Sequence, residues 1–173
     1  MLVSAVLSYF LIFLTAIPDE AGHGWYRYPF YPFLIISIAL FIKEYFTKKG
    51  LRYEDVGPYK LDKDDDYSDF AFRVGEKVAH DNTSRGILIC GSGAGVVIAA
   101  NKVKGIRAVN VADIKNAKLS REHIDANIIG FSAWNLPFNK MKKIVDVWLN
   151  TPFSNLDRHR RRINKISNYE SRR

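Results

Sequence analysis

The sequence predicts an α/β fold, a three-layer α/β/α sandwich with a Rossmann-like parallel sheet, and three observations support it. Short apolar runs alternate with amphipathic stretches along most of the chain, as in parallel strands joined by crossover helices. Residues 86–90 are apolar without interruption and end in Cys90, as expected of a central strand covered on both faces. A glycine-rich turn follows directly at residues 91–95, and in such sheets ligands bind at the carboxyl ends of the strands.

The other elements follow from periodicity and end signals. Phe70, Val74 and Val78 recur at helical spacing, so their helix buries one face. Asp113 is a plausible N-cap, and Gly50 is the C-cap of a helix with lysines in its last turn. We expect further strands at 51–57, 105–111 and 127–131, and an acidic loop at 60–68. We expect helices at 66–81, from about Ala94, at 113–125 and at 138–150, and a last helix in the basic tail. The helix at 138–150 should bury Met141, Ile144, Val145 and Trp148.

The composition excludes several classes of protein. A length of 173 residues suits one domain with its own core. The single cysteine excludes an internal disulfide, so nothing indicates an oxidising compartment, and we expect a cytoplasmic protein. Without paired cysteines, and with only four histidines, the chain offers no zinc motif. We predict neither a metal nor a cofactor.

The C-terminal tail carries much of the net charge of +8. Residues 157–173 contain seven Lys/Arg against two acids. Three interpretations fit such a tail: a solvated helix, an anion or phosphate site, or nucleic-acid contact. No nucleic-acid-binding motif supports the last, so we predict no nucleic-acid partner.

The N-terminal segment differs from the rest of the chain. Residues 1–18 and 33–42 are apolar, but neither stretch reaches the ~20 residues of a membrane-spanning helix. No basic residue precedes the first stretch, so it is a poor signal peptide. We therefore divide the chain into an atypical apolar segment, residues 1–40, and a domain, residues 41–173. We expect the first segment to fit the domain poorly, and membrane contact through residues 1–42 stays open without being favoured.

The turn at residues 91–95 and the cysteine before it indicate chemistry. A strand, a glycine turn and a helix gather backbone N–H groups around one point, which favours anions. The turn lacks the spacing of a P-loop or a dinucleotide fold, and a tight strand–helix turn with Cys90 as a small core residue is the simpler alternative. A thiol in this place has its thiolate stabilised. It could remove a proton next to a carbonyl while the N–H groups hold the enediolate.

Four stretches then resemble one family. They are GILICGSGAGVVIAANKVKGIRAV from residue 86, AKLSREHIDAN from 117, IVDVWLNTPF from 144 and DRHRRRINKI from 157. In order and spacing they are similar to ribose-5-phosphate isomerase B and its sugar-phosphate isomerase relatives, including galactose-6-phosphate isomerase, over about residues 41–167. The resemblance implies aldose–ketose isomerisation in the pentose phosphate pathway, a small sugar phosphate as substrate, and a homodimer with shared active sites.

The resemblance also implies roles for individual residues. Cys90 would move the proton between C1 and C2 of the sugar. His123 would open the furanose ring, since a histidine titrates near neutral pH. Arg158 and Arg162 would bind the phosphate through guanidinium groups. The other implied site residues are Tyr67, lining the sugar pocket, and Gly91, Ser92, Gly93 and Gly95, cradling the enediolate oxygens.

The sequence departs from the family in one motif and at two single positions. The family's Asp-His signature after the first strand is missing, and the nearest match is Asp19 followed by Glu20. Ile124 stands in place of asparagine, and Trp134 in place of a phosphate-binding arginine. Three interpretations stay open: an active isomerase whose first strand comes from the apolar N-terminus; a degenerate member that binds a phosphorylated sugar without turnover; and a reading-frame error near residue 40. The sugar could also be allose or galactose 6-phosphate.

Overall fold

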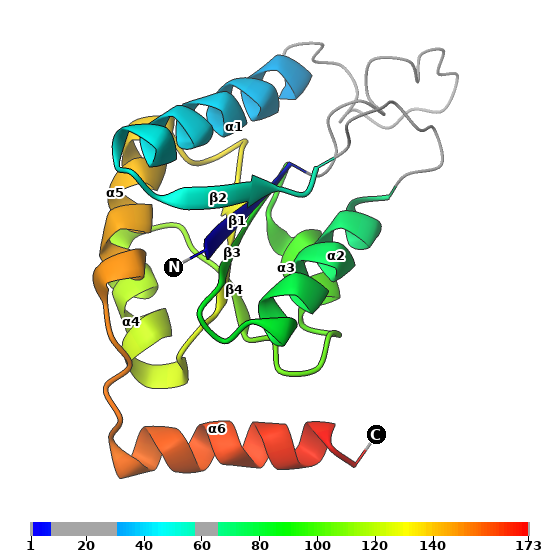
Figure 1. Cartoon of the computed structure of the whole chain (residues 1–173), viewed down its shortest axis with the longest axis vertical. Helices are drawn as coiled ribbons and strands as arrows, with labels where there is room; N and C mark the ends of the chain where they lie inside the picture. The colour runs from blue at the N-terminus through cyan, green and yellow to red at the C-terminus, as the bar shows by residue number, and fades with distance from the viewer. Residues whose placement is uncertain (1, 8–30, 58–65, 173) are drawn as a thin grey trace.

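A single parallel sheet forms the centre of the molecule (Figure 1). The structure, a computed structural model, describes residues 2–7, 31–57 and 66–172. Within these residues the strand order is β2-β1-β3-β5-β4, and every neighbouring pair is parallel. The strands are β1 (Leu2–Leu7), β2 (Arg52–Asp55), β3 (Arg85–Cys90), β4 (Ala108–Asn110) and β5 (Ile128–Ser132).

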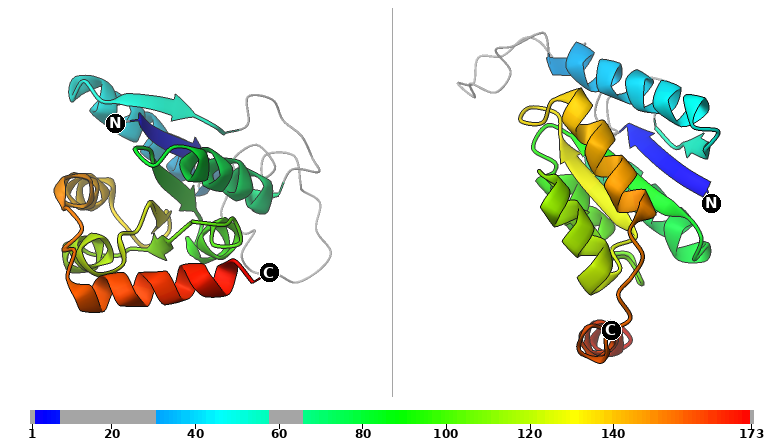
Figure 2. Two further views of the ribbon diagram at one scale, coloured as in Figure 1. Left: turned by 60° about the horizontal axis from the view of Figure 1, so that its bottom comes forward. Right: turned by 90° about the vertical axis from the view of Figure 1, so that its left-hand side faces the viewer.

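Helices cover both faces of the sheet, so the predicted three-layer α/β/α sandwich is confirmed. One face carries α1 (Tyr31–Lys48), α4 (Ile114–Ile124) and α5 (Phe138–Asn150), and the other carries α2 (Tyr67–His80) and α3 (Ala94–Ala100). The last helix, α6 (Asp157–Glu170), belongs to neither layer. Figure 2 shows it standing off from the body of the molecule, beside the end of α4.

Strand β3 separates two apolar cores. Ile87 and Ile89 face the core under α1, α4 and α5, whereas Leu88 faces the core under α2 and α3. This is why the strand reads as a continuous apolar run: successive side chains point to opposite faces, and both faces are buried. The predicted helix faces are confirmed, since Phe70, Val74 and Val78 of α2 and Met141, Ile144, Val145 and Trp148 of α5 are buried.

The predicted helix ends are confirmed as well. The Asp113 carboxylate accepts a hydrogen bond from the Asn116 backbone N–H at 2.7 Å, and Gly50, just beyond α1, has the left-handed φ of 65°. The strand expected at 105–111 is shorter in the structure. Gly105 turns the chain with φ of 83°, and the Arg107 N–H bonds the Asn127 side chain at 2.8 Å, so the ladder begins only at Ala108.

The N-terminal strand corrects one expectation. We expected the apolar segment to fit the domain poorly, but β1 pairs with β2 on one side and β3 on the other, near the centre of the sheet. Helix α1 likewise runs through residue 40 without a break. The look-alike Asp19 and Glu20 lie outside the described residues, and so does the rest of segment 8–30. In the part of the chain that the structure describes, no helix is both long and apolar enough to cross a membrane.

Candidate active site

Cys90 is the last residue of β3, at the carboxyl edge of the sheet, as predicted. Its side chain is half-buried. Burial raises the pKa of the Cys90 thiol, while hydrogen bonds from the backbone N–H groups of Gly93, Gly91 and Ser92 lower it. These donors come from the glycine loop that directly follows the thiol. The expected net stabilisation of the thiolate is wrong, however, because desolvation of the charged form is the larger effect.

Two aromatic side chains pack on this loop so closely that only glycine fits beneath them. A Cβ built on Gly91 would lie 2.3 Å from the Trp134 ring, and one on Gly95 would lie 2.8 Å from the Tyr67 ring. Tyr67 therefore reaches Gly95 from the first turn of α2, and its place in a sugar pocket stays a prediction. Trp134, 36% exposed, stands over the residue that follows the thiol.

Two carbonyl groups of the loop accept hydrogen bonds from side chains at the ends of β4 and β5. The Asn110 side-chain amide at the end of β4 donates to the Ser92 carbonyl at 3.2 Å. The Ser132 hydroxyl at the end of β5 donates to the Gly91 carbonyl at 2.8 Å. Sequence reasoning missed both residues. The available signal was that each is a polar residue ending a predicted strand, where parallel sheets place their functional groups.

His123, Arg158 and Arg162 lie at the opposite edge of the sheet. Helix α4 starts beyond the carboxyl end of β4 and ends just before β5 begins, so its 11 residues carry the chain back by about 16 Å. His123 lies in the last turn of α4, and both arginines lie in the first half of α6, beside it. A single chain therefore does not bring the predicted site together.

A second histidine joins this group. The rings of His123 and His159 lie 4.4 Å apart between centroids, and His159 is 2% exposed. The Arg158 Nε donates to His159 Nε2 at 3.2 Å, and His159 Nδ1 lies 2.7 Å from Ser154 Oγ. Burial lowers the pKa of His159, and the neighbouring His123, Arg158 and Arg162 lower it further, against a hydrogen bond to the Glu122 backbone that raises it. Sequence reasoning did not single out His159.

An ion network fixes the end of α4 that carries His123. The guanidinium of Arg121 is buried and contacts the Asp125 carboxylate at 2.6 Å and the Thr151 carbonyl at 3.3 Å. Arg107 contacts the other Asp125 oxygen at 2.9 Å. These contacts hold Asp125 at its left-handed φ of 47°. They also attach the start of the connection to α6.

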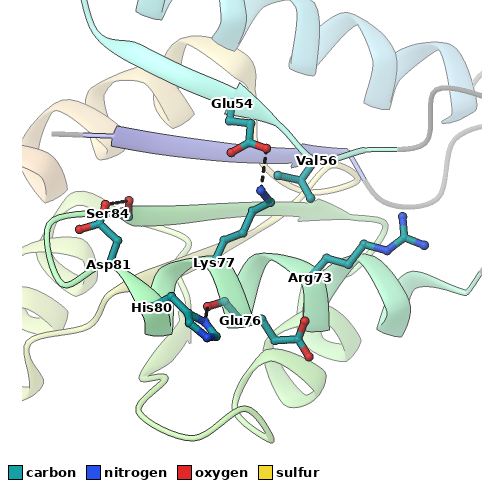
Figure 3. A pocket seen from close by; sticks show the side chains of 8 residues that line it. All are labelled: Glu54, Val56, Arg73, Glu76, Lys77, His80, Asp81 and Ser84. Carbon is teal, nitrogen blue, oxygen red and sulfur yellow. Dashed lines mark hydrogen bonds and ion pairs between the residues drawn. The ribbon is translucent and has the colours of Figure 1, made fainter.

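A separate pocket of about 400 Å³ lies between α2 and β2 (Figure 3). Two of its charged side chains pair with each other, Lys77 with Glu54 at 2.7 Å. Hydrogen bonds from Ser84 and Thr83 lower the pKa of Asp81 to about 2. None of the predicted site residues lines this pocket, so we do not assign the active site to it.

Comparison with known proteins decides the family. The model of the Ribose/Galactose Isomerase family matches residues 36–166. This chain belongs to that family. The family member "Probable ribose-5-phosphate isomerase B" of Mycoplasma genitalium is 43% identical over 136 residues, covering 78% of this chain and 89% of the relative. Ribose-5-phosphate isomerase B of Escherichia coli is 37% identical over 132 residues, covering 76% and 87%.

Solved structures of family members share the fold. The crystal structure of the Mycoplasma genitalium enzyme with bound ribulose-5-phosphate has a TM-score of 0.78 at 34% identity, covering 99% of this chain and 97% of that one. The Clostridium thermocellum ribose-5-phosphate isomerase B has a TM-score of 0.73 at 34% identity, covering 99% of each chain. The resemblance stated from the motifs is thus confirmed, whereas the roles of individual residues stay predictions.

Proposed function

We propose that this chain is an aldose–ketose isomerase that interconverts ribose 5-phosphate and ribulose 5-phosphate through an enediolate, with Cys90 as the base. One observation supports this most strongly: a half-buried thiol ends β3 at the carboxyl edge of the sheet, directly before a glycine loop whose backbone N–H groups lower the pKa of that thiol. Family membership supports a sugar phosphate as substrate, and relatives named for ribose 5-phosphate support the pentose.

The chemistry follows from this geometry. The Cys90 thiolate takes the proton from C2 of the open-chain aldose, and the C–H electrons form the C1–C2 double bond while negative charge moves to the carbonyl oxygen at C1. The electrons of the C1–C2 double bond then take the proton back from the thiol at C1, which regenerates the thiolate. The C2 hydroxyl gives its proton to the oxyanion on C1, so that C2 becomes the ketone and C1 carries the hydroxyl. The backbone N–H groups of Gly91, Ser92 and Gly93 would stabilise negative charge first on the Cys90 sulfur and then on the enediolate oxygens of the sugar.

We propose that the second half of the site comes from another copy of the chain. His123, Arg158 and Arg162 lie at the edge opposite Cys90, so a two-fold dimer is the simplest arrangement that joins them to it. Exposed apolar side chains on and just before α6, which include Leu156 at 47% and Ile166 at 56%, support an interface there. In this dimer His123 opens the furanose bound by the other copy, and the two guanidinium groups bind its phosphate.

A second candidate is binding of a phosphorylated sugar without turnover. The position of Trp134 favours it, because its ring covers Gly91 where the family resemblance places a phosphate-binding arginine. An indole cannot replace a cation against phosphate. Allose and galactose 6-phosphate are the other substrates to compare, since the family description includes galactose.

Conversion of ribose 5-phosphate to ribulose 5-phosphate in D₂O tests the proposal. We expect turnover by the wild type with solvent deuterium entering at the carbon that receives the proton, and loss of nearly all turnover in Cys90→Ala with the fold intact. Equal rates for both proteins would exclude Cys90 as the base. Sugar-phosphate binding by a wild type that is inactive on all three sugars would establish the non-catalytic candidate.

A further inference from the structure

In the loop after Cys90, the carbonyl groups of successive peptide units accept hydrogen bonds from β4, β5 and the turn after β5. Three backbone N–H groups, those of Gly91, Ser92 and Gly93, follow Cys90 directly and lower the pKa of its thiol. Each belongs to a peptide unit whose carbonyl comes from the preceding residue. These carbonyls also accept hydrogen bonds. That of Cys90 accepts from the Ala133 N–H at 2.9 Å, and that of Ser92 accepts from Asn110 Nδ2 at 3.2 Å. The Gly91 carbonyl accepts from Ser132 Oγ at 2.8 Å and from the Trp134 N–H at 3.3 Å, so it retains one donor when Ser132 is truncated.

Peptide geometry connects these two sets of hydrogen bonds. A peptide unit is planar and trans, so its C=O and its N–H point in opposite directions. A donor that fixes the Gly91 carbonyl therefore also fixes the direction of the Ser92 N–H. In the same way a donor on the Ser92 carbonyl fixes the direction of the Gly93 N–H, which is the strongest of the three hydrogen-bond influences on Cys90.

We infer that Asn110 and Ser132 are positioning residues that orient the loop N–H groups toward the Cys90 sulfur. Neither needs to touch the substrate. Asn110 acts through the Ser92–Gly93 peptide and Ser132 through the Gly91–Ser92 peptide. The inference rests on the proposed role of Cys90 as the base, but it makes a claim about the thiol that holds whether or not the enzyme turns over.

The groups around Cys90 allow the effect of these two residues on the thiol to be measured. The influences found on the Cys90 thiol are burial and the three loop donors, with no charged side chain among them. Among the described residues, Tyr67 is a titratable side chain that lies against the loop, at Gly95. Asn110 is exposed and Ser132 half-buried, so truncating either opens no buried cavity. Because Cys90 is the single cysteine of the chain, alkylation reports on it alone.

The test is the pH dependence of Cys90 alkylation by iodoacetamide in the full-length protein without substrate. In Asn110→Ala and in Ser132→Ala we expect the midpoint of the pH–rate curve to rise by about one pH unit, since each variant loosens a donor to the thiolate. The shift should be larger for Asn110→Ala. Ser132→Thr retains a hydroxyl and should retain the wild-type midpoint.

Matched controls remove comparable hydrogen bonds elsewhere. Asn116→Ala removes a side-chain amide bonded to Asp113, and Ser171→Ala removes a hydroxyl bonded to the Ser167 carbonyl; neither should move the midpoint. If Asn110→Ala and Ser132→Ala retain the wild-type midpoint, or if the controls move it equally, the inference is wrong. An unchanged midpoint in an active enzyme would reject the positioning role alone. A shifted midpoint in an inactive enzyme would reject the proposed function alone.

Discussion

The acidity of Cys90 is set by two opposing influences, burial and the loop donors, and burial is the larger. Its pKa therefore lies above the ordinary thiol value, and the thiol is mostly protonated at neutral pH. The neutral thiol stabilises the folded chain below the pKa of the unfolded state, and this contribution is lost as the pH rises through the raised pKa of the folded state. The loop donors lower that pKa in part, which favours the thiolate that the proposed reaction needs.

This balance predicts the pH dependence of the reaction. Because the proposed base is the thiolate, we expect kcat/KM for ribose 5-phosphate to rise with pH and to continue rising through the ordinary thiol range. The rising limb should coincide with the alkylation curve of Cys90 in the free enzyme. A kcat/KM that is flat from pH 7 to 9, while alkylation still increases, would show that another group limits the rate.

The contact between Gly91 and Trp134 gives a second prediction at this scale. A Cβ on residue 91 would lie 2.3 Å from the indole, so Gly91→Ala must displace the ring or the loop. We expect a loss of about 1–3 kcal/mol in the free energy of unfolding, measured by urea denaturation. In a Trp134→Ala background the same change should cost much less. Equal costs in both backgrounds would contradict the contact.

Helix α6 places Arg158 and Arg162 one turn apart, beside the end of α4. Phosphate bound there should raise the melting temperature, as any ligand of the native state does. Arg158→Ala/Arg162→Ala should lose this shift, while Arg160→Ala, which removes the partner of Asp157 at 2.5 Å, should retain it. A shift that survives the double change, or strong salt-dependent binding of DNA, would favour a different role for the basic tail.

Elements with a strong local pattern could be predicted from the sequence, and those that depend on distant partners could not. The buried faces of α2 and α5 and the N-cap at Asp113 follow from spacing and residue type alone. Strand β1 is apolar like the residues that follow it, so only its pairing with β2 and β3 shows where it lies. The shortening of β4 depends on Asn127, twenty residues away.

The same distinction applies to the candidate site. Cys90 and the glycine turn are adjacent in the chain and could be found together. Asn110 and Ser132 act on the turn only because β4, β5 and β3 end at one edge, and no local pattern reveals such a register. The sequence could not show that His159 is buried while the arginines next to it in the chain are exposed, because its burial arises from packing against α4.

At the scale of the whole molecule, the proposed site consists of two halves at opposite edges of one sheet. Cys90 and its loop lie at the carboxyl edge, and His123 with the α6 arginines lies at the amino edge. The central claim is that the carboxyl edge of one copy and the amino edge of another together isomerise a sugar phosphate. Variants defective in different halves should therefore complement each other in a mixed dimer.

Activity of such mixtures is the most direct measurement. Cys90→Ala and Arg158→Ala/Arg162→Ala are each expected to be nearly inactive on ribose 5-phosphate. After co-expression, half of randomly assembled dimers contain one of each chain and one intact site out of two, so we expect about a quarter of the wild-type activity. If mixed dimers form, as shown by pull-down of differently tagged chains, and the mixture is no more active than its components, the shared site is contradicted.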